Sequence, residues 1–197
     1  MTILITAFDP FGDLSENASQ RVLETLDGLA GLVTEVLPTA FSAATERVLG
    51  LIDTHQPAAV VCLGVAEKSS ALRLERVALN LDDARIPDNH GAQPRGSQID
   101  PAAPPAYWAT LPIEDMHAAL IAAGVPGEIS NHAGTFVCNH VFFAVQHYLT
   151  LTAPATPAGF IHVPGIRPAD AAADAPGLPL DDIVRGVRAC LGVLYGG

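Results

Sequence analysis

Apolar and polar positions alternate along this 197-residue chain in a way that separates short strands from longer helices. Runs of β-branched and other apolar residues predict strands buried in a sheet; they lie at residues 2–8, 32–40, 58–64 and 158–164. Residues 72–80 alternate more regularly, so we expect a strand with one polar face there, and residues 127–130 suit a short strand. Helical periodicity is found at residues 18–29, 42–55, 112–123, 138–149 and 180–195.

Strands that alternate with helices predict an α/β fold. We expect residues 1–197 to form a single three-layer α/β/α domain, in which helices cover both faces of a mostly parallel twisted sheet. Asn17 and Ser42 are suited to the N-caps of the first two helices, and Pro112 is suited to the first position of the third.

Three polar features fall at or near the ends of predicted strands. They are the "DPFG" loop after residue 8, the Asp-, Pro- and Gly-rich segment 81–105, and the "HVP" sequence that contains His162. In open α/β sheets, ligands bind at the carboxyl ends of the strands. We therefore expect these segments to meet around one site.

Composition narrows the range of partners. The formal net charge is -11 at pH 7, which disfavours nucleic acid and anionic membrane surfaces as partners. No apolar stretch is long enough to span a bilayer, and the N-terminus lacks the basic region of a signal peptide. Three cysteines do not make a disulfide framework, so we expect a reducing, cytoplasmic location.

Cys138 allows three interpretations. Cys62 and Cys190 lie within apolar segments and are expected in the core, whereas Cys138 follows a loop and opens a helix. It could be a buried packing residue, a zinc ligand together with His132 and His140, or a nucleophile activated by the helix N-terminus. Cys138 and His140 are two residues apart on a helix and do not share a face, which weighs against zinc.

His162 and Glu75 are open to similar alternatives. His162 ends an apolar strand, where it is either a core histidine bonded to backbone or a general base at the sheet edge. Glu75 is either a carboxylate on the exposed face of its strand or an inward-facing carboxylate. In the second case burial is costly without a partner such as histidine.

Five segments together resemble one family closely. They are "TAFDPFG" followed by Asn17, "ERVALNLDDARIPDNHGAQP", "PAYWATLPI", "ISNHAGTFVCNH" and "GFIHVP". In this order and spacing, from Met1 to about Pro164, they resemble pyroglutamyl peptidase I, also called pyrrolidone-carboxylate peptidase. The resemblance implies a cytoplasmic cysteine peptidase that removes N-terminal pyroglutamate from peptides. It implies no metal or organic cofactor, and a homo-oligomer, often a tetramer.

The resemblance also implies a role for individual residues. Cys138 takes the place of the nucleophile, His162 that of the base and Glu75 that of the acid that orients the base. Phe8 and Phe11 would hold the pyrrolidone ring, and Arg85 would lie near the oxyanion. The remaining residues that the resemblance assigns to substrate binding are Asn17, Ile86, Phe136 and Val137.

The chain departs from the family pattern at Ala7, Asp13 and His90, and across a segment that contains Val65 and residues 67–69. These differences concern the rim of the pocket and not the three triad positions. They leave a catalytically silent binding protein on the same fold as a further alternative, beside the zinc hydrolase.

Overall fold

The computed structural model describes residues 1–172 and 175–195, and its centre is a six-stranded sheet. The strand order is β2-β1-β3-β8-β4-β7. The bounds are β1 Ile3–Phe8, β2 Leu32–Leu37, β3 Ala59–Ala66, β4 Leu72–Glu75, β7 Gly127–Ser130 and β8 Ala158–Pro164. β2, β1, β3 and β8 are parallel, whereas β4 is antiparallel to β8 and parallel to β7. The predicted α/β fold with a mostly parallel sheet is confirmed.

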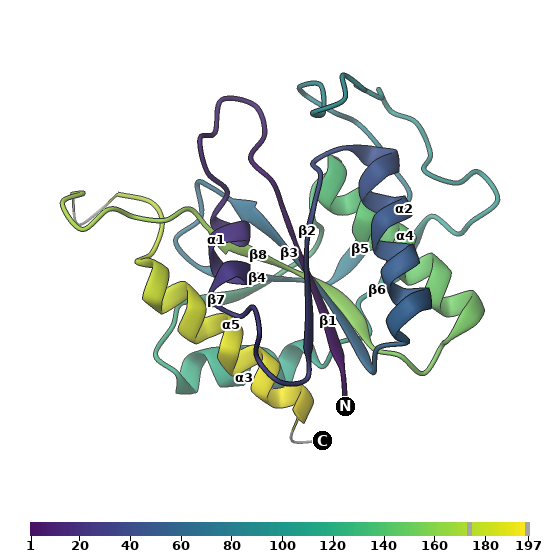
Figure 1. The fold of residues 1–197 in the computed structure, drawn as a ribbon. Coiled ribbons are helices and arrows are strands. Elements are labelled where there is room, and N and C mark those ends of the chain that lie inside the picture. The colour runs from purple at the N-terminus through teal and green to yellow at the C-terminus, as the bar shows by residue number, and fades with distance from the viewer. Residues whose placement is uncertain (173–174, 196–197) are drawn as a thin grey trace.

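Helices cover both faces of this sheet (Figure 1). α2 (Phe41–His55) and α4 (Val137–Thr152) lie on one face. α1 (Ala18–Glu24), α3 (Ile113–Ala122) and α5 (Leu180–Tyr195) lie on the other. Each layer buries its own apolar cluster against the sheet, which is what alternating strand and helix patterns require. None of the helices in the described ranges combines the length and apolar character needed to cross a bilayer.

One predicted strand is divided. Residues 72–80 form β4 and then β5 (Val77–Leu79), which leaves the main sheet and pairs with β6 (Ala106–Trp108) in a separate two-stranded sheet. Arg76 lies between them, and its N–H donates to Ser130 O where β4 leaves the ladder. The local alternation continues through both halves, so the sequence pattern did not reveal the break.

Several predicted helix ends differ from the structure; α4, for example, runs from Val137 to Thr152 and so extends beyond its predicted range at both ends. α1 stops at Glu24 because residues 25–28 turn away from the helix, with Gly28 at a φ of 73°. α2 begins at Phe41, so Ser42 is not its N-cap. The Phe41 N–H instead donates to Asp88 Oδ2 at 2.9 Å, from a residue far away in the sequence. Pro112 occupies the N-cap of α3 and not its first helical position.

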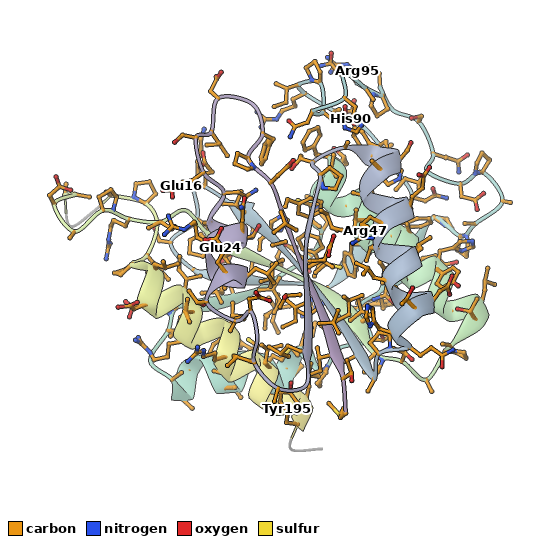
Figure 2. The ribbon with its side chains drawn as sticks, in the orientation of Figure 1. Glu16, Glu24, Arg47, His90, Arg95 and Tyr195 are labelled. Atoms are coloured by element: carbon orange, nitrogen blue, oxygen red, sulfur yellow. The ribbon has the colours of Figure 1, made fainter. Side chains whose placement is uncertain are left out.

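Two long loops project from the edge of the sheet where β1, β3 and β8 end (Figure 1). One is the loop after β1, and the other is the segment 81–105, which carries His90 and Arg95 near its tip (Figure 2). Asn89 joins them, because its Nδ2 donates to Pro10 O at 2.9 Å and to Asp9 Oδ1 at 3.1 Å. The predicted meeting of polar segments at this edge is confirmed.

Candidate active site

Cys138 is the second residue of α4 and is half-buried. A turn with Gly134 at a φ of 80° brings the chain to Phe136, which is the N-cap of the helix. The N–H groups of a first helical turn have no partner within the helix and carry the positive end of its dipole. The thiol therefore lies beside groups that stabilise a thiolate and, during a reaction, an oxyanion.

Gly64 of β3 lies directly beneath the sulfur. A Cβ atom at this position would be 2.9 Å from Cys138 Sγ and 2.8 Å from the ring of Phe160. Gly64 is also the residue paired with His162 across the β3–β8 ladder. The close approach of α4 to β3 thus brings the thiol to the strand position next to the histidine, and it requires a residue without a side chain.

His162 and Glu75 meet diagonally across the β8–β4 ladder. The imidazole Nδ1 is 2.8 Å from Glu75 Oε1, and the two side chains are 9% and 1% exposed. An ionised carboxylate only accepts hydrogen bonds, so Nδ1 carries the proton in this pair. Nε2 is then the ring nitrogen left for the Cys138 thiol, which raises the pKa of this imidazole.

Opposing effects act on the pKa of His162. Burial lowers this pKa, whereas the hydrogen bond and charge of Cys138 and then those of Glu75 raise it, to about 9. Burial raises the pKa of the other two thiols, Cys62 and Cys190, to about 12. Both therefore stay protonated near neutral pH and are unreactive core residues.

The aromatic residues expected around the substrate lie in two separate sets of ring contacts. Phe8 is buried and stacks on Phe160 with ring centroids 6.3 Å apart. Phe11 contacts Phe136 at 5.8 Å, and Phe136 meets Phe41 edge-on at 5.5 Å. Phe8 and Phe11 thus belong to different ring pairs in this structure and are not stacked on each other.

Two other expected binding residues have their side chains within the protein. Asn17 is buried; its Oδ1 accepts from Ser19 N and Oγ, and its Nδ2 donates to Asp9 O at 3.0 Å. It therefore caps α1, as predicted, and also holds the loop after β1 in place. Val137 is fully buried in the cluster between the sheet and the helices α2 and α4.

A groove of about 860 Å³ lies next to the triad. Phe11, Arg85 and Ile86 line it, as does Arg73 of β4, whose Nε is 3.8 Å from Glu75 Oε1. The lining also includes several of the positions where the chain departs from the family pattern: Asp13, Val65, Glu67, Lys68 and Ser69. These departures line one continuous rim of the site.

Asn139 is a site residue that the sequence did not reveal. It is fully buried on a mostly apolar side of its helix, where Gln146 is buried as well. Its Oδ1 accepts from Leu79 N at 2.9 Å, and its Nδ2 donates to Leu79 O and Leu81 O. These bonds fix the start of the loop that carries Arg85 to helix α4, at the position directly after Cys138. An amide directly after the cysteine, on a buried helix, was the available signal.

The residues proposed for zinc are used differently. His140 Nδ1 is 2.8 Å from Asp82 Oδ2, and His132 Nδ1 accepts from Gly134 N. Within residues 1–172 and 175–195, no group of three or more His, Cys, Asp or Glu side chains is arranged to hold a metal ion. His132, Cys138 and His140 therefore do not form the zinc site that the sequence left open.

Comparisons with known proteins agree with this site. The family model described as Pyroglutamyl peptidase matches residues 1–195. The pyrrolidone-carboxylate peptidase of Gloeobacter violaceus is 44% identical over 98% of this chain and 97% of its own length, and that of Bacillus subtilis is 42% identical over 94% and 88%.

Solved structures of such enzymes have the same fold. Pyroglutamyl peptidase I of Bacillus amyloliquefaciens superimposes with a TM-score of 0.91 at 37% identity, covering 96% of this chain and 94% of that one. A mutant pyrrolidone carboxyl peptidase of Pyrococcus furiosus gives 0.91 at 32% identity, covering 100% and 99%. The chain therefore belongs to the pyroglutamyl peptidase family, whose members remove an N-terminal pyroglutamate from peptides.

Proposed function

We propose that Cys138, His162 and Glu75 are the catalytic triad with which this peptidase removes N-terminal pyroglutamate. The observation that carries the proposal is the hydrogen-bonded pair of Glu75 and His162 beside a thiol at the start of α4. Glu75 Oε1 is 2.8 Å from His162 Nδ1, and Cys138 Sγ lies over Gly64, the residue paired with His162 in the β3–β8 ladder. A carboxylate, an imidazole and a nucleophile in this order form the general arrangement of acyl-transfer triads.

The first half of the reaction forms an acyl-enzyme. The Cys138 thiolate attacks the carbonyl carbon that links pyroglutamate to the next residue, and the N–H groups of the first turn of α4 stabilise the oxyanion. The His162 imidazolium donates its Nε2 proton to the leaving amine. The C–N bond breaks, the shortened peptide departs, and a pyroglutamyl thioester remains on Cys138.

Water completes the cycle. His162, now neutral, removes a proton from water through Nε2 while the oxygen attacks the thioester carbonyl. The C–S bond breaks, pyroglutamic acid leaves, and the thiolate–imidazolium pair is restored. Glu75 fixes the imidazole tautomer and stabilises its positive charge in both steps.

Substrate binding at the ring end follows from the chemistry of pyroglutamate. The ring is uncharged and flat, so apolar walls suit it. We propose that Phe8 and Phe11 form those walls, with Phe136 and Val137 behind them. Arg85 and Ile86 contact the substrate from the loop 81–105. Asn17 acts indirectly, by holding in place the loop that carries Phe11.

We also propose that residues 1–197 form one peptidase domain that works in the cytoplasm as a homo-oligomer, a tetramer by family resemblance. The three cysteines are unpaired, which is compatible with a reducing compartment. Light scattering of the purified protein tests the oligomer, and a monomer at all concentrations would contradict it.

The nucleophile can be tested by comparing two cysteine variants. Cys138→Ala should abolish release of a chromophoric amine from a pyroglutamyl amide and leave the protein folded. Cys62→Ala is the matched control, because its thiol is buried and protonated; it should keep turnover and lose about 1 kcal/mol of stability. Turnover by Cys138→Ala at a rate near that of the wild type would refute the triad.

A further inference from the structure

Arg73 stands beside the proposed triad without belonging to it. It is paired with His162 across the β4–β8 ladder, and it precedes Glu75 by two residues on the same strand. Directly opposed residues and residues two apart share one face of a sheet, so the three side chains point to the same side. Arg73 Nε is 3.8 Å from Glu75 Oε1.

The guanidinium is anchored on its other side by β7. Its Nη2 donates to Ser130 Oγ at 3.0 Å, and Nε is 3.2 Å from Glu128 Oε1. Ser130 and Glu128 are the β7 residues opposite Glu75 and Arg73. These contacts hold the cation next to the triad, although 37% of the side chain remains exposed toward the groove.

The buried carboxylate of Glu75 requires a positive charge nearby. Its carboxylate is 1% exposed, and Oε2 is buried with no hydrogen-bond partner. An ionised carboxylate in such a site costs free energy unless positive charge compensates it. Among the described residues, Arg73 and His162 are the only cationic side chains within 4 Å of it.

The net charge of the active form shows why His162 alone does not compensate the negative charge of the site. In the attacking state the site contains a thiolate, an imidazolium and a carboxylate, which sum to one negative charge. The thiolate and the carboxylate share the single imidazolium between them. A second cation at Arg73 makes the group neutral, and an opposite charge within about 4–6 Å favours the charged form of its neighbour.

We propose that Arg73 is a positioning residue of this peptidase, whose fixed positive charge compensates the buried carboxylate of Glu75 and thereby holds His162 in its catalytic orientation. This inference rests on the triad proposed above and adds a fourth, charge-balancing member to it. Arg73 makes no hydrogen bond to Glu75, so its effect on the triad is electrostatic.

The other charges near this group come from several elements. Cys138 faces His162 from α4, and Glu128 faces Arg73 from β7. Glu128 is 55% exposed, so solvent screens it more than the buried Glu75. The loops that line the adjoining groove contribute Asp13, Glu67, Lys68 and Arg85.

Loss of the cation should shift the pH dependence in one direction. Each deprotonation of the triad increases the negative charge next to Arg73, so without Arg73 each one becomes less favourable. For Arg73→Gln we expect the acid and alkaline limbs of kcat/KM against pH both to move up by roughly 0.5 to 1 pH unit. Arg73→Lys retains the charge and should keep both limbs near those of the wild type.

The substrate should be a pyroglutamyl amide of a neutral aromatic amine, so that Arg73 has no charged leaving group to bind. Arg76→Gln is the matched control. It removes a cation three residues away that contacts Asn131 and Glu114 instead of the triad. Its profile of kcat/KM against pH should therefore match that of the wild type. The proposal would be overturned if the pH profile of Arg73→Gln matched that of the wild type, even with a lower Tm. It would also be overturned if the profile of Arg76→Gln shifted by the same amount as that of Arg73→Gln.

The rate of Cys138 alkylation by iodoacetamide, measured against pH, separates failure of this proposal from failure of the triad. If Arg73 acts as proposed, the alkylation profile of Arg73→Gln should move up with the kcat/KM profile. Profiles that coincide with those of the wild type would overturn the role of Arg73 and leave the triad intact. If iodoacetamide inactivates neither the wild type nor any variant, the triad itself is wrong, and this proposal falls with it.

Discussion

His162 is held between two groups that carry negative charge in the active enzyme. Burial lowers its pKa, but Cys138 and Glu75 outweigh burial and raise the pKa to about 9, compared with about 6.5 in an unfolded chain. The imidazolium is thus the resting form at neutral pH. Its contribution to stability is fully present below about pH 6.5 and is lost as the pH rises through about 9.

This pKa predicts an alkaline limit to activity. Proton donation to the leaving amine requires the imidazolium, so kcat/KM should fall as the pH rises through about 9. Cys138→Ala removes the group that contributes most to raising the pKa, so the histidine should then titrate at lower pH. NMR titration of the His162 ring protons in both proteins measures this. A wild-type midpoint near 6.5, unchanged in Cys138→Ala, would contradict the ion pair.

At this scale the sequence allowed part of the site to be predicted. Cys138 and His162 were identifiable as candidates because each interrupts an apolar pattern at the end of an element. The choice among their alternative roles came from the family resemblance. Arg73 and Asn139 were not identified. The roles of both depend on partners in distant segments, Glu128 and Ser130 for Arg73 and residues 79–81 for Asn139, and only Asn139 left a local signal, as an amide on a buried helix.

The packing of α4 against β3 determines where the nucleophile lies. The first turn of α4 approaches the strand so closely that Cys138 Sγ and the ring of Phe160 occupy the space above Gly64. A glycine within a strand often marks such a close approach. The catalytic geometry therefore depends on the distance between two elements as well as on the three triad side chains.

Gly64→Ala tests this dependence. The added methyl group would overlap the Phe160 ring and Cys138 Sγ, so these side chains or the start of α4 must shift. We expect a loss of about 1–3 kcal/mol in unfolding free energy from overpacking, and a fall in kcat on the order of 100-fold from misplacement of the thiol.

Gly50→Ala is the control for this substitution. Gly50 lies in α2 with no atom within 4 Å of the added carbon, so the substitution should leave kcat unchanged and raise stability by about 0.5–1 kcal/mol. Wild-type kcat in Gly64→Ala would show that the α4–β3 distance does not control the reaction.

Elements with a strong local pattern were predicted well, and two of the errors have a similar cause. The boundaries of β8 and α5 agree with the prediction, whereas the β4–β5 break and the start of α2 do not. In both failures the deciding hydrogen bond comes from a distant residue, Ser130 for the break and Asp88 for the helix start. Local periodicity contains no information on such bonds.

At the scale of the whole molecule, the site depends on a change of direction within the sheet. β8 runs with β3 on one side and against β4 on the other, and His162 lies on β8 between Gly64 and Arg73. The α/β class was predictable from alternating elements, but the reversal of β4 was not, because sequence patterns do not encode strand direction. That reversal brings Glu75 and Arg73 to the histidine.

The central claim is that Cys138 is the nucleophile of a pyroglutamyl acyl transfer. Labelling with a pyroglutamyl chloromethyl ketone, followed by peptide mapping by mass spectrometry, tests it most directly, because the thiolate displaces chloride and retains the ligand. We predict one adduct per chain, on Cys138, with loss of activity in proportion to labelling and protection by a pyroglutamyl peptide. Complete inactivation with the adduct on any other residue would contradict the account.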